Sequence, residues 1–266
     1  QKTAALINKY FVAVKVDREE RPDIDQVYMD VCRAMTGSGG WPLSIFMTAD
    51  KKPFYAATYI PKEDKYGRRG LLSLLPQIYD LWLNDREQLL NHSENVIKHL
   101  INEQDNHDQN QKLNPEIIRE TADILSRIYD QNYDGFGNQP KFPMPQYLIF
   151  LLEQGKENLD NNYLKMAEKS LAAMRAGAIF DQLGGGFHRY ATDRKWELPH
   201  FEKMLYDQAL LIYTYAEAYQ LTKKDIYLDT IKKTVSYLKR EMRDQNGSFY
   251  SAEDADSEGI EGKFYF

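Results

Sequence analysis

Titratable side chains gather in one stretch of the chain, residues 178–208, which reads AIFDQLGGGFHRYATDRKWELPHFEKMLYDQ. Three consecutive glycines, 184–186, let the backbone approach a neighbour or a ligand closely. Histidines and carboxylic acids follow the glycines, and such groups serve as general acids and bases in catalysis. We therefore predict catalytic roles for His188, His200, Glu202 and Asp207.

The same stretch also holds aromatic and charged side chains in addition to the histidines and acids. Long loops of this composition on a helical scaffold usually serve function. An alternative stays open, in which the loop packs on the surface and backbone hydrogen bonds satisfy its histidines. On the functional interpretation, the predicted substrate-binding residues are Asp181, Arg189, Tyr190, Trp196 and Lys203.

A mostly hydrophobic segment follows, and it predicts a helix over 201–220 that is buried on nearly all sides. Lys203 and Asp207 are four residues apart, with His200 one turn earlier, so the three would form one stripe on that helix. A buried charge is costly unless it is paired or used. Two interpretations remain: a Lys203–Asp207 ion pair that holds the helix, or a polar pocket where His200 and Asp207 reach a substrate.

A second acidic segment, EDADSE, covers residues 253–258. It resembles the start of a calcium-binding loop, but position twelve would be Tyr265, where a bidentate glutamate is required. We predict that Asp254 and Asp256 act as general acids or bases, or accept hydrogen bonds from sugar hydroxyls. A solvated acidic loop is the alternative. The histidines lack the spacing of a zinc site, so we expect no metal and no cofactor.

The composition and charge of the chain argue against some classes of binding partner. The chain has 266 residues, a formal net charge of −6 and a mean hydropathy of −0.63. We expect no nucleic-acid or membrane partner, because such binders need a basic face or a long apolar run. The one cysteine, Cys32, cannot form an intrachain disulfide, which fits a reducing compartment and a cytoplasmic location.

A composition shift divides the chain. Residues 102–114 (NEQDNHDQNQKLN) have linker composition, so we predict one domain over 1–101 and another over 115–266. The first domain alternates strand and helix patterns and is predicted to be α/β. Its expected elements are strands at 11–16, 43–48 and 54–60 and helices at 23–35 and 71–101, the latter containing Pro76.

The second domain is predicted to be all-helical, with helices at 115–131, 145–156, 160–176, 201–220 and 224–243. A glycine and phenylalanine signal recurs in the connections, at Phe136, Phe187 and Phe249. A loose period of this size, with two helices per unit, is typical of stacked or toroidal helical hairpins. About half of a six-hairpin ring would fit, so we expect a ring that is incomplete at the C-terminus and a chain truncated at both ends.

Several long segments resemble the YyaL-type family, which contains the spermatogenesis-associated thioredoxin-like proteins of animals. The resemblance implies a truncated thioredoxin-like domain, with Trp41 and Pro42 in its cis-proline loop, followed by an (α/α)6 toroid. Such toroids are similar to those of N-acylglucosamine 2-epimerases and six-hairpin glycosidases. The matching segments are VKVDREERPDIDQVYM (14–29), GSGGWPLSIFMT (37–48), PKFPMP (140–145), FDQLGGGFHRYATDRKWELPHFEKMLYDQALL (180–211) and SAEDADSEG (251–259).

The resemblance leaves several functions open. The toroid implies a sugar-like ligand and an epimerase- or glycosidase-like reaction that uses histidine and carboxylate groups. The family's CHWC motif would lie upstream of residue 1, so redox activity is not expected of this chain. In the intact protein the alternative is a thiol–disulfide oxidoreductase or redox chaperone, with protein clients at the thioredoxin-like domain. A third hypothesis is a scaffold without catalysis.

Overall fold

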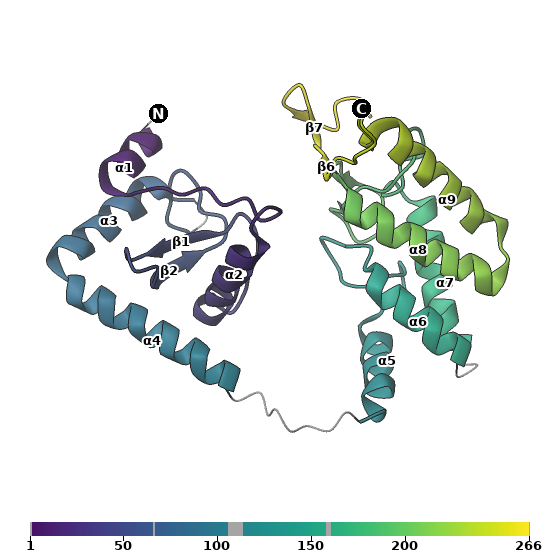
Figure 1. Cartoon of the computed structure of the whole chain (residues 1–266), viewed down its shortest axis with the longest axis horizontal. Helices are drawn as coiled ribbons and strands as arrows, with labels where there is room; N and C mark the ends of the chain where they lie inside the picture. Colours follow the sequence, from purple (N-terminus) through teal and green to yellow (C-terminus); the bar gives the residue numbers. More distant parts are fainter. Residues whose placement is uncertain (1, 66, 106–113, 158–160, 266) are drawn as a thin grey trace. The chain divides into compact units, whose positions relative to one another are not determined.

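The chain divides into two units, Gln1–Lys112 and Leu113–Phe266. Two short strands form the sheet of the first unit. β1 (Ser44–Met47) pairs antiparallel with β2 (Pro53–Ala57). The computed structural model describes residues 2–65, 67–105, 114–157 and 161–265 (Figure 1).

Four helices accompany this sheet: α1 (Lys2–Tyr10), α2 (Pro22–Thr36), α3 (Leu71–Asn84) and α4 (Arg86–Asp105). Proline begins α2, where its missing N–H costs nothing, and acidic residues fill the first turn. Val31 and Cys32 of α2 pack with Ala56 of β2 in one small core. Phe54 of β2 packs with Leu74 and Ile78 of α3 in another. The predicted α/β character of the first unit is confirmed.

Residues 11–17 belong to no helix or strand, although 11–16 was predicted as a strand. Within the described part of the chain, β1 and β2 pair only with each other. Val12 and Val14 are largely exposed. The prediction is wrong for a physical reason: a β-branched run favours the extended backbone, but a strand also needs a neighbour with which to form a ladder.

The single helix predicted over 71–101 is two helices. The break falls at Asp85, between α3 and α4, whereas Pro76 lies inside α3. α4 extends to Asp105, beyond the predicted boundary at residue 101. Most of the predicted linker 102–114, residues 106–113, lies outside the residues that the structure describes.

The second unit contains helices arranged as hairpins (Figure 1). α6 packs against α7, α8 against α9, and α6 against α8. Leu211, Tyr215 and Ala218 of α8 are fully buried in the main hydrophobic core. The predicted mixed fold class, an α/β unit followed by a helical one, is thereby confirmed. The elements are α5 (Glu116–Ile128), α6 (Pro145–Glu157), α7 (Asn161–Ala176), α8 (Leu205–Thr222), α9 (Asp225–Tyr237) and a π-helical turn (Leu238–Met242).

Three long connections, 129–144, 177–204 and 243–265, gather at one end of this unit, because the two helices of each hairpin run in opposite directions. Short antiparallel pairings join the connections to themselves and to each other. β3 (Tyr190–Ala191) pairs with β4 (Pro199–His200). The remaining pairs are β5 (Lys203–Met204) with β6 (Ala252–Glu253), and β7 (Asp256–Ser257) with β8 (Ile260–Glu261).

The three connections begin with the same aspartate turn. In each, the aspartate N–H donates to a carbonyl four or five residues later, and its side-chain Oδ1 accepts two further backbone N–H groups. The phenylalanine that follows closes a bridge to the residue before the aspartate. This turn explains the glycine and phenylalanine signal in the sequence. The aspartates are Asp130, Asp181 and Asp244, and the phenylalanines are Phe136, Phe187 and Phe249.

Buried lysines secure the first two of these turns. Lys141 Nζ lies 2.9 Å from Asp130 Oδ2, and Lys203 Nζ lies 2.7 Å from Asp181 Oδ2. Arg194 adds two more hydrogen bonds to Asp130. A buried carboxylate is tolerated only when its charge and lone pairs are satisfied, and these partners supply both.

Candidate acid–base site

His200 is oriented by a carboxylate from the third connection. Its Nδ1 lies 2.6 Å from Glu261 Oε1, and its ring stacks on that of Tyr190 at a centroid distance of 4.9 Å. The β3–β4 register places Tyr190 directly opposite His200. The imidazole keeps 26% of its surface exposed. His200 therefore combines a fixed ring orientation with access to solvent, which a general base requires.

An ion pair lies beside this histidine. Arg189 donates to Glu202 at 2.6 Å, and the backbone N–H of Arg189 donates to the carbonyl of Glu202 at 2.8 Å. The same Glu202 oxygen, Oε2, lies 3.8 Å from Nε2 of His200. The structure thus brings together Arg189, His200 and Glu202, all three of which were predicted site residues.

Asp207 stands in the first turn of α8 and is 9% exposed. The pKa of its carboxyl is raised to about 7, chiefly by burial. The positive charge of Arg189 acts to lower this pKa, and the negative charge of Glu202 acts to raise it. A carboxyl group with such a pKa both holds and releases a proton near neutral pH. Asp207 can therefore act as an acid or as a base next to the Arg189–Glu202 pair.

His188 occupies a different environment. It is 1% exposed, and its Nδ1 lies 3.0 Å from the carbonyl oxygen of Phe201. A carbonyl only accepts, so Nδ1 carries the proton of the neutral ring. Burial, reinforced by the charge of Lys203, lowers the pKa of His188 to about 4. This histidine is neutral at neutral pH and is packed among aromatic rings rather than presented to solvent.

Lys203 pairs with Asp181, and the predicted alternative of a Lys203–Asp207 ion pair is wrong. The reason is where the helix begins: α8 starts at Leu205, so Lys203 lies in β5 and shares no helical stripe with Asp207. Burial alone would raise the pKa of Asp181, but hydrogen bonds from Lys203, Tyr265 and a backbone N–H lower it to about 2. The pair was predicted to bind substrate, and the structure buries it.

Trp196 lies in the core. It is 1% exposed, and its indole N–H donates to the carbonyl oxygen of Tyr133 at 3.1 Å. Its φ of 69° is unusual for a bulky residue. Because solvent reaches almost none of this side chain, we assign Trp196 a structural role in place of the predicted sugar contact.

Asp254 and Asp256 are exposed in the third connection. Asp254 Oδ1 accepts the N–H of Asp256 at 3.1 Å. Within the described residues, neither carboxylate bonds to His200, Glu202 or Asp207. Asp256 does stand opposite Glu261 in the β7–β8 pair.

Glu261 is the residue that sequence reasoning missed. Its only signal was an acidic residue close to the EDADSE segment, and the β7–β8 turn that returns it to His200 has no clear sequence pattern. We call the six residues brought together here the acid–base cluster: Arg189, Tyr190, His200, Glu202, Asp207 and Glu261.

In the first unit, the Trp41–Pro42 peptide bond is cis. Trp41 is half exposed, donates its indole N–H to Asp25 at 2.9 Å and lies under the Arg18 guanidinium. Cys32 is buried.

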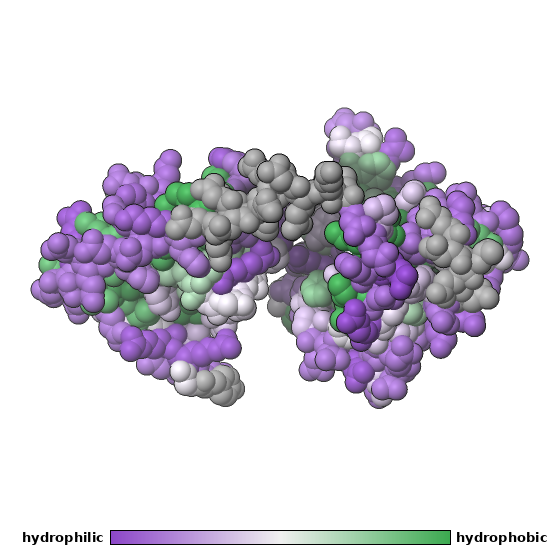
Figure 2. Space-filling model, turned by 90° about the horizontal axis from the view of Figure 1, so that it is seen from below, coloured by the Kyte–Doolittle hydropathy of each residue, from purple (hydrophilic) through white to green (hydrophobic). Residues whose placement is uncertain are grey.

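Hydrophilic surface covers much of both units, and apolar patches interrupt it (Figure 2). Among the described residues, no helix is long and apolar enough to cross a membrane. The described part of the chain also contains no group of three or more histidine, cysteine, aspartate or glutamate side chains placed to hold a metal ion.

The amino-acid sequence is similar to those of several known proteins. Residues 1–101 match the family model Thioredox_DsbH, described as "Protein of unknown function, DUF255". Human spermatogenesis-associated protein 20 is 40% identical over 259 residues, which are 95% of this chain and 33% of that protein. An uncharacterised protein of Caenorhabditis elegans is 38% identical over 261 residues, 96% of this chain and 35% of that protein. The chain thus spans about a third of these relatives.

Similar solved structures include cellobiose 2-epimerase from Bacillus thermoamylovorans, with a TM-score of 0.46 and 16% identity over 52% of this chain and 39% of that one. A D-mannose isomerase has a TM-score of 0.40 and 17% identity over 69% of this chain and 45% of that one.

Proposed function

This chain belongs to the family that contains spermatogenesis-associated protein 20, and we propose that its helical unit binds a sugar-like molecule and transforms it by acid–base catalysis. The observation that carries the proposal is the His200–Glu261 contact of 2.6 Å beside the Arg189–Glu202 pair. This arrangement places a base with a fixed orientation, His200, beside a cation, Arg189.

The reaction that fits this arrangement best is epimerisation or isomerisation next to a carbonyl group. Nε2 of His200 removes the proton from the carbon beside the carbonyl, and the bonding electron pair moves onto the carbonyl oxygen. Arg189 stabilises the resulting oxyanion by its charge. Glu261 stabilises the imidazolium that forms, since its carboxylate faces Nδ1.

Asp207 completes the proton balance. With a pKa of about 7, its protonated form donates a proton to a carbon atom of the enediolate, which restores a carbonyl group; in isomerisation the remaining hydroxyl proton also moves from one oxygen to the other. The proton held by His200 then replaces the one that Asp207 has given up, directly or through water. Substrate and product have the same atoms, so no external oxidant or reductant is needed.

Glycoside hydrolysis is the competing reaction of the same residues, with protonated Asp207 as the acid that protonates the leaving oxygen. A protein client of the first unit and a thiol–disulfide activity of the intact protein stay predictions from the sequence resemblance.

The test is to incubate the intact natural chain with reducing mono- and disaccharides in D2O and to follow the sugars by proton NMR. Exchange of the proton beside the carbonyl is expected for the unaltered protein and is expected to be lost in His200→Gln. His92→Gln, at an exposed histidine of the first unit, is the matched control and should keep full exchange. Cleavage without exchange would assign hydrolysis instead. Equal exchange in His200→Gln, or no reaction of any sugar, would contradict the proposal.

A further inference from the structure

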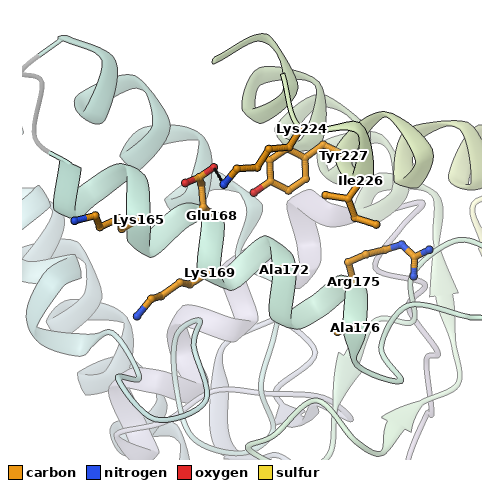
Figure 3. A pocket seen from close by; sticks show the side chains of 9 residues that line it. All are labelled: Lys165, Glu168, Lys169, Ala172, Arg175, Ala176, Lys224, Ile226 and Tyr227. Atoms are coloured by element: carbon orange, nitrogen blue, oxygen red, sulfur yellow. Dashed lines mark hydrogen bonds and ion pairs between the residues drawn. The ribbon is translucent and has the colours of Figure 1, made fainter. Parts of the chain in front are cut away.

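A concave site lies on the side of the helical unit, between α7 and the start of α9 (Figure 3). Its cavity measures about 430 Å³, within the range of small-molecule sites. None of its residues belongs to the acid–base cluster. The lining residues are Lys165, Glu168, Lys169, Ala172, Arg175, Ala176, Lys224, Ile226 and Tyr227.

The floor of this cavity is apolar. Ala172 and Ala176 lie one turn apart on α7, and their small side chains leave the space open. Ile226 and Tyr227 extend toward this face of α7 from the beginning of α9 (Figure 3). A ligand with an apolar body would therefore displace water from both walls, which favours binding.

The rim is cationic. Lys165, Lys169, Lys224 and Arg175 contribute four positive charges, against the single carboxylate of Glu168. This excess is notable in a chain whose net charge is −6.

Within the described residues, two of these cations have no ion-pair partner. Glu168 is engaged by Lys224 at 2.6 Å, and Arg175 is paired with Asp229 at 3.3 Å. Lys165 and Lys169, one turn apart on α7, form no ion pair within the described part of the chain and are exposed. Two adjacent unpaired ammonium groups favour an anionic group of a ligand.

We propose that this cavity binds a small organic anion with an apolar body, such as an aryl or alkyl phosphate, sulfonate or carboxylate. The anionic group lies between Lys165 and Lys169, and the apolar body covers Ala172 and Ile226. The proposal is independent of the acid–base cluster, since the two share no residue.

The test uses a fluorescent probe of this class, 8-anilinonaphthalene-1-sulfonate, titrated into the full chain. Lys165→Glu/Lys169→Glu is expected to weaken binding at least tenfold, through loss of attraction and added repulsion. Lys232→Glu/Lys239→Glu changes the charge of the same helical unit equally at exposed positions outside the cavity, and it should alter affinity less than twofold. Equal weakening in both double variants would overturn the proposal.

Two further measurements separate the contributions of charge and shape. Ala172→Trp fills the floor at an exposed helical position without changing the charge, and it is expected to reduce binding at least tenfold. The neutral analogue N-phenyl-1-naphthylamine should bind the unaltered chain at least tenfold more weakly than the sulfonate. Unchanged binding in Ala172→Trp, or equal affinity for the neutral analogue, would contradict the proposal. Circular dichroism checks that each variant is folded.

Discussion

Nδ1 of His200 lies 2.6 Å from Oε1 of Glu261, although 61 positions of sequence separate the two residues. The contact joins the second connection of the helical unit to the third. β5–β6 pairs the same two connections a few residues away, at Lys203 and Glu253. The orientation of the proposed base is therefore fixed by a segment that contributes no helix to the core.

Replacing either member of this pair should slow the proposed proton exchange. We expect His200→Gln to reduce the rate by about 10²–10⁴-fold, the usual contribution of a general base. Glu261→Gln should reduce it less, because the imidazole remains while its orienting charge is lost. The double variant should be no slower than His200→Gln, since Glu261 acts through the histidine. Independent, multiplicative losses measured by NMR exchange would contradict this relation.

The charges beside Asp207 should move its pKa in opposite directions. Arg189→Met is expected to raise the pKa of Asp207 above about 7, and Glu202→Gln is expected to lower it. The reason is that a positive neighbour favours the ionised carboxyl and a negative neighbour opposes it. Carbon NMR of the labelled carboxyl measures both shifts. Shifts of the same sign in the two variants would show that packing, not charge, governs this pKa.

His188 and Asp207 should give opposite pH dependences of stability. The folded-state pKa of His188 is about 4, below its usual 6.5, so its unfolded form binds more protons between these values. The free energy of unfolding then rises with pH across this window, by about 3 kcal/mol. The pKa of Asp207 is raised from 3.8 to about 7, so its contribution falls between pH 4 and 7 by about 4 kcal/mol.

These two contributions largely cancel in the natural chain, and single substitutions should reveal each of them. Asp207→Asn is expected to leave a stability that increases from pH 4 to 6.5. His188→Gln should leave one that decreases up to pH 7. Urea unfolding at a series of pH values measures the slopes. Slopes of the same sign in the two variants would refute the assignment.

The buried lysine of the first connection should matter far more than an exposed one. Lys141→Met leaves the buried carboxylate of Asp130 with Arg194 as its one charged partner among the described residues, and we expect a loss of about 3 kcal/mol. Lys52→Met breaks a pair with Glu94 whose side chains are about half exposed, and its cost should stay below about 1 kcal/mol. Comparable losses in denaturant unfolding would contradict the expectation.

Gly186 and Gly137 provide a matched test of packing at a positive φ. Their φ values are 78° and 81°, so alanine is strained at both, by about 1–2 kcal/mol. A Cβ on Gly186 would lie 2.5 Å from the ring of Tyr237, whereas one on Gly137 meets nothing within 4 Å. Gly186→Ala should therefore cost about 1–3 kcal/mol more than Gly137→Ala. Equal melting temperatures of the two variants would be inconsistent with a rigid ring.

Local patterns were enough to predict most helices of the second unit, because hydrophobic periodicity is a local signal. The prediction of 145–156 closely matches α6. The predicted helix 201–220 began too early, since residues 203–204 pair with a strand about 50 residues later. The predicted strand 11–16 failed for the related reason that a local pattern does not show whether a neighbouring strand is available, and in the described residues β1 and β2 pair only with each other.

The residues of the candidate site also fall into two groups: those that local sequence patterns could predict and those that they could not. Arg189, His200 and Glu202 come together because one short pairing, β3–β4, and one ion pair link nearby residues. Asp181 was predicted to bind substrate, whereas it is buried in an ion pair with Lys203, the lysine that one alternative had paired with Asp207. Glu261 was out of reach of any local pattern, because only the turn between β7 and β8 returns it to the site.

The contacts between the second and third connections have a consequence for the order of folding. The aspartate turns close over a few residues and can form early, whereas the His200–Glu261 contact must wait until a distant segment docks. We therefore expect the orientation of the proposed base to be established late in folding and lost early in unfolding. Amide hydrogen exchange should find β6 and β8 opening well before α8, and mild denaturant should abolish ligand binding while the helical signal persists.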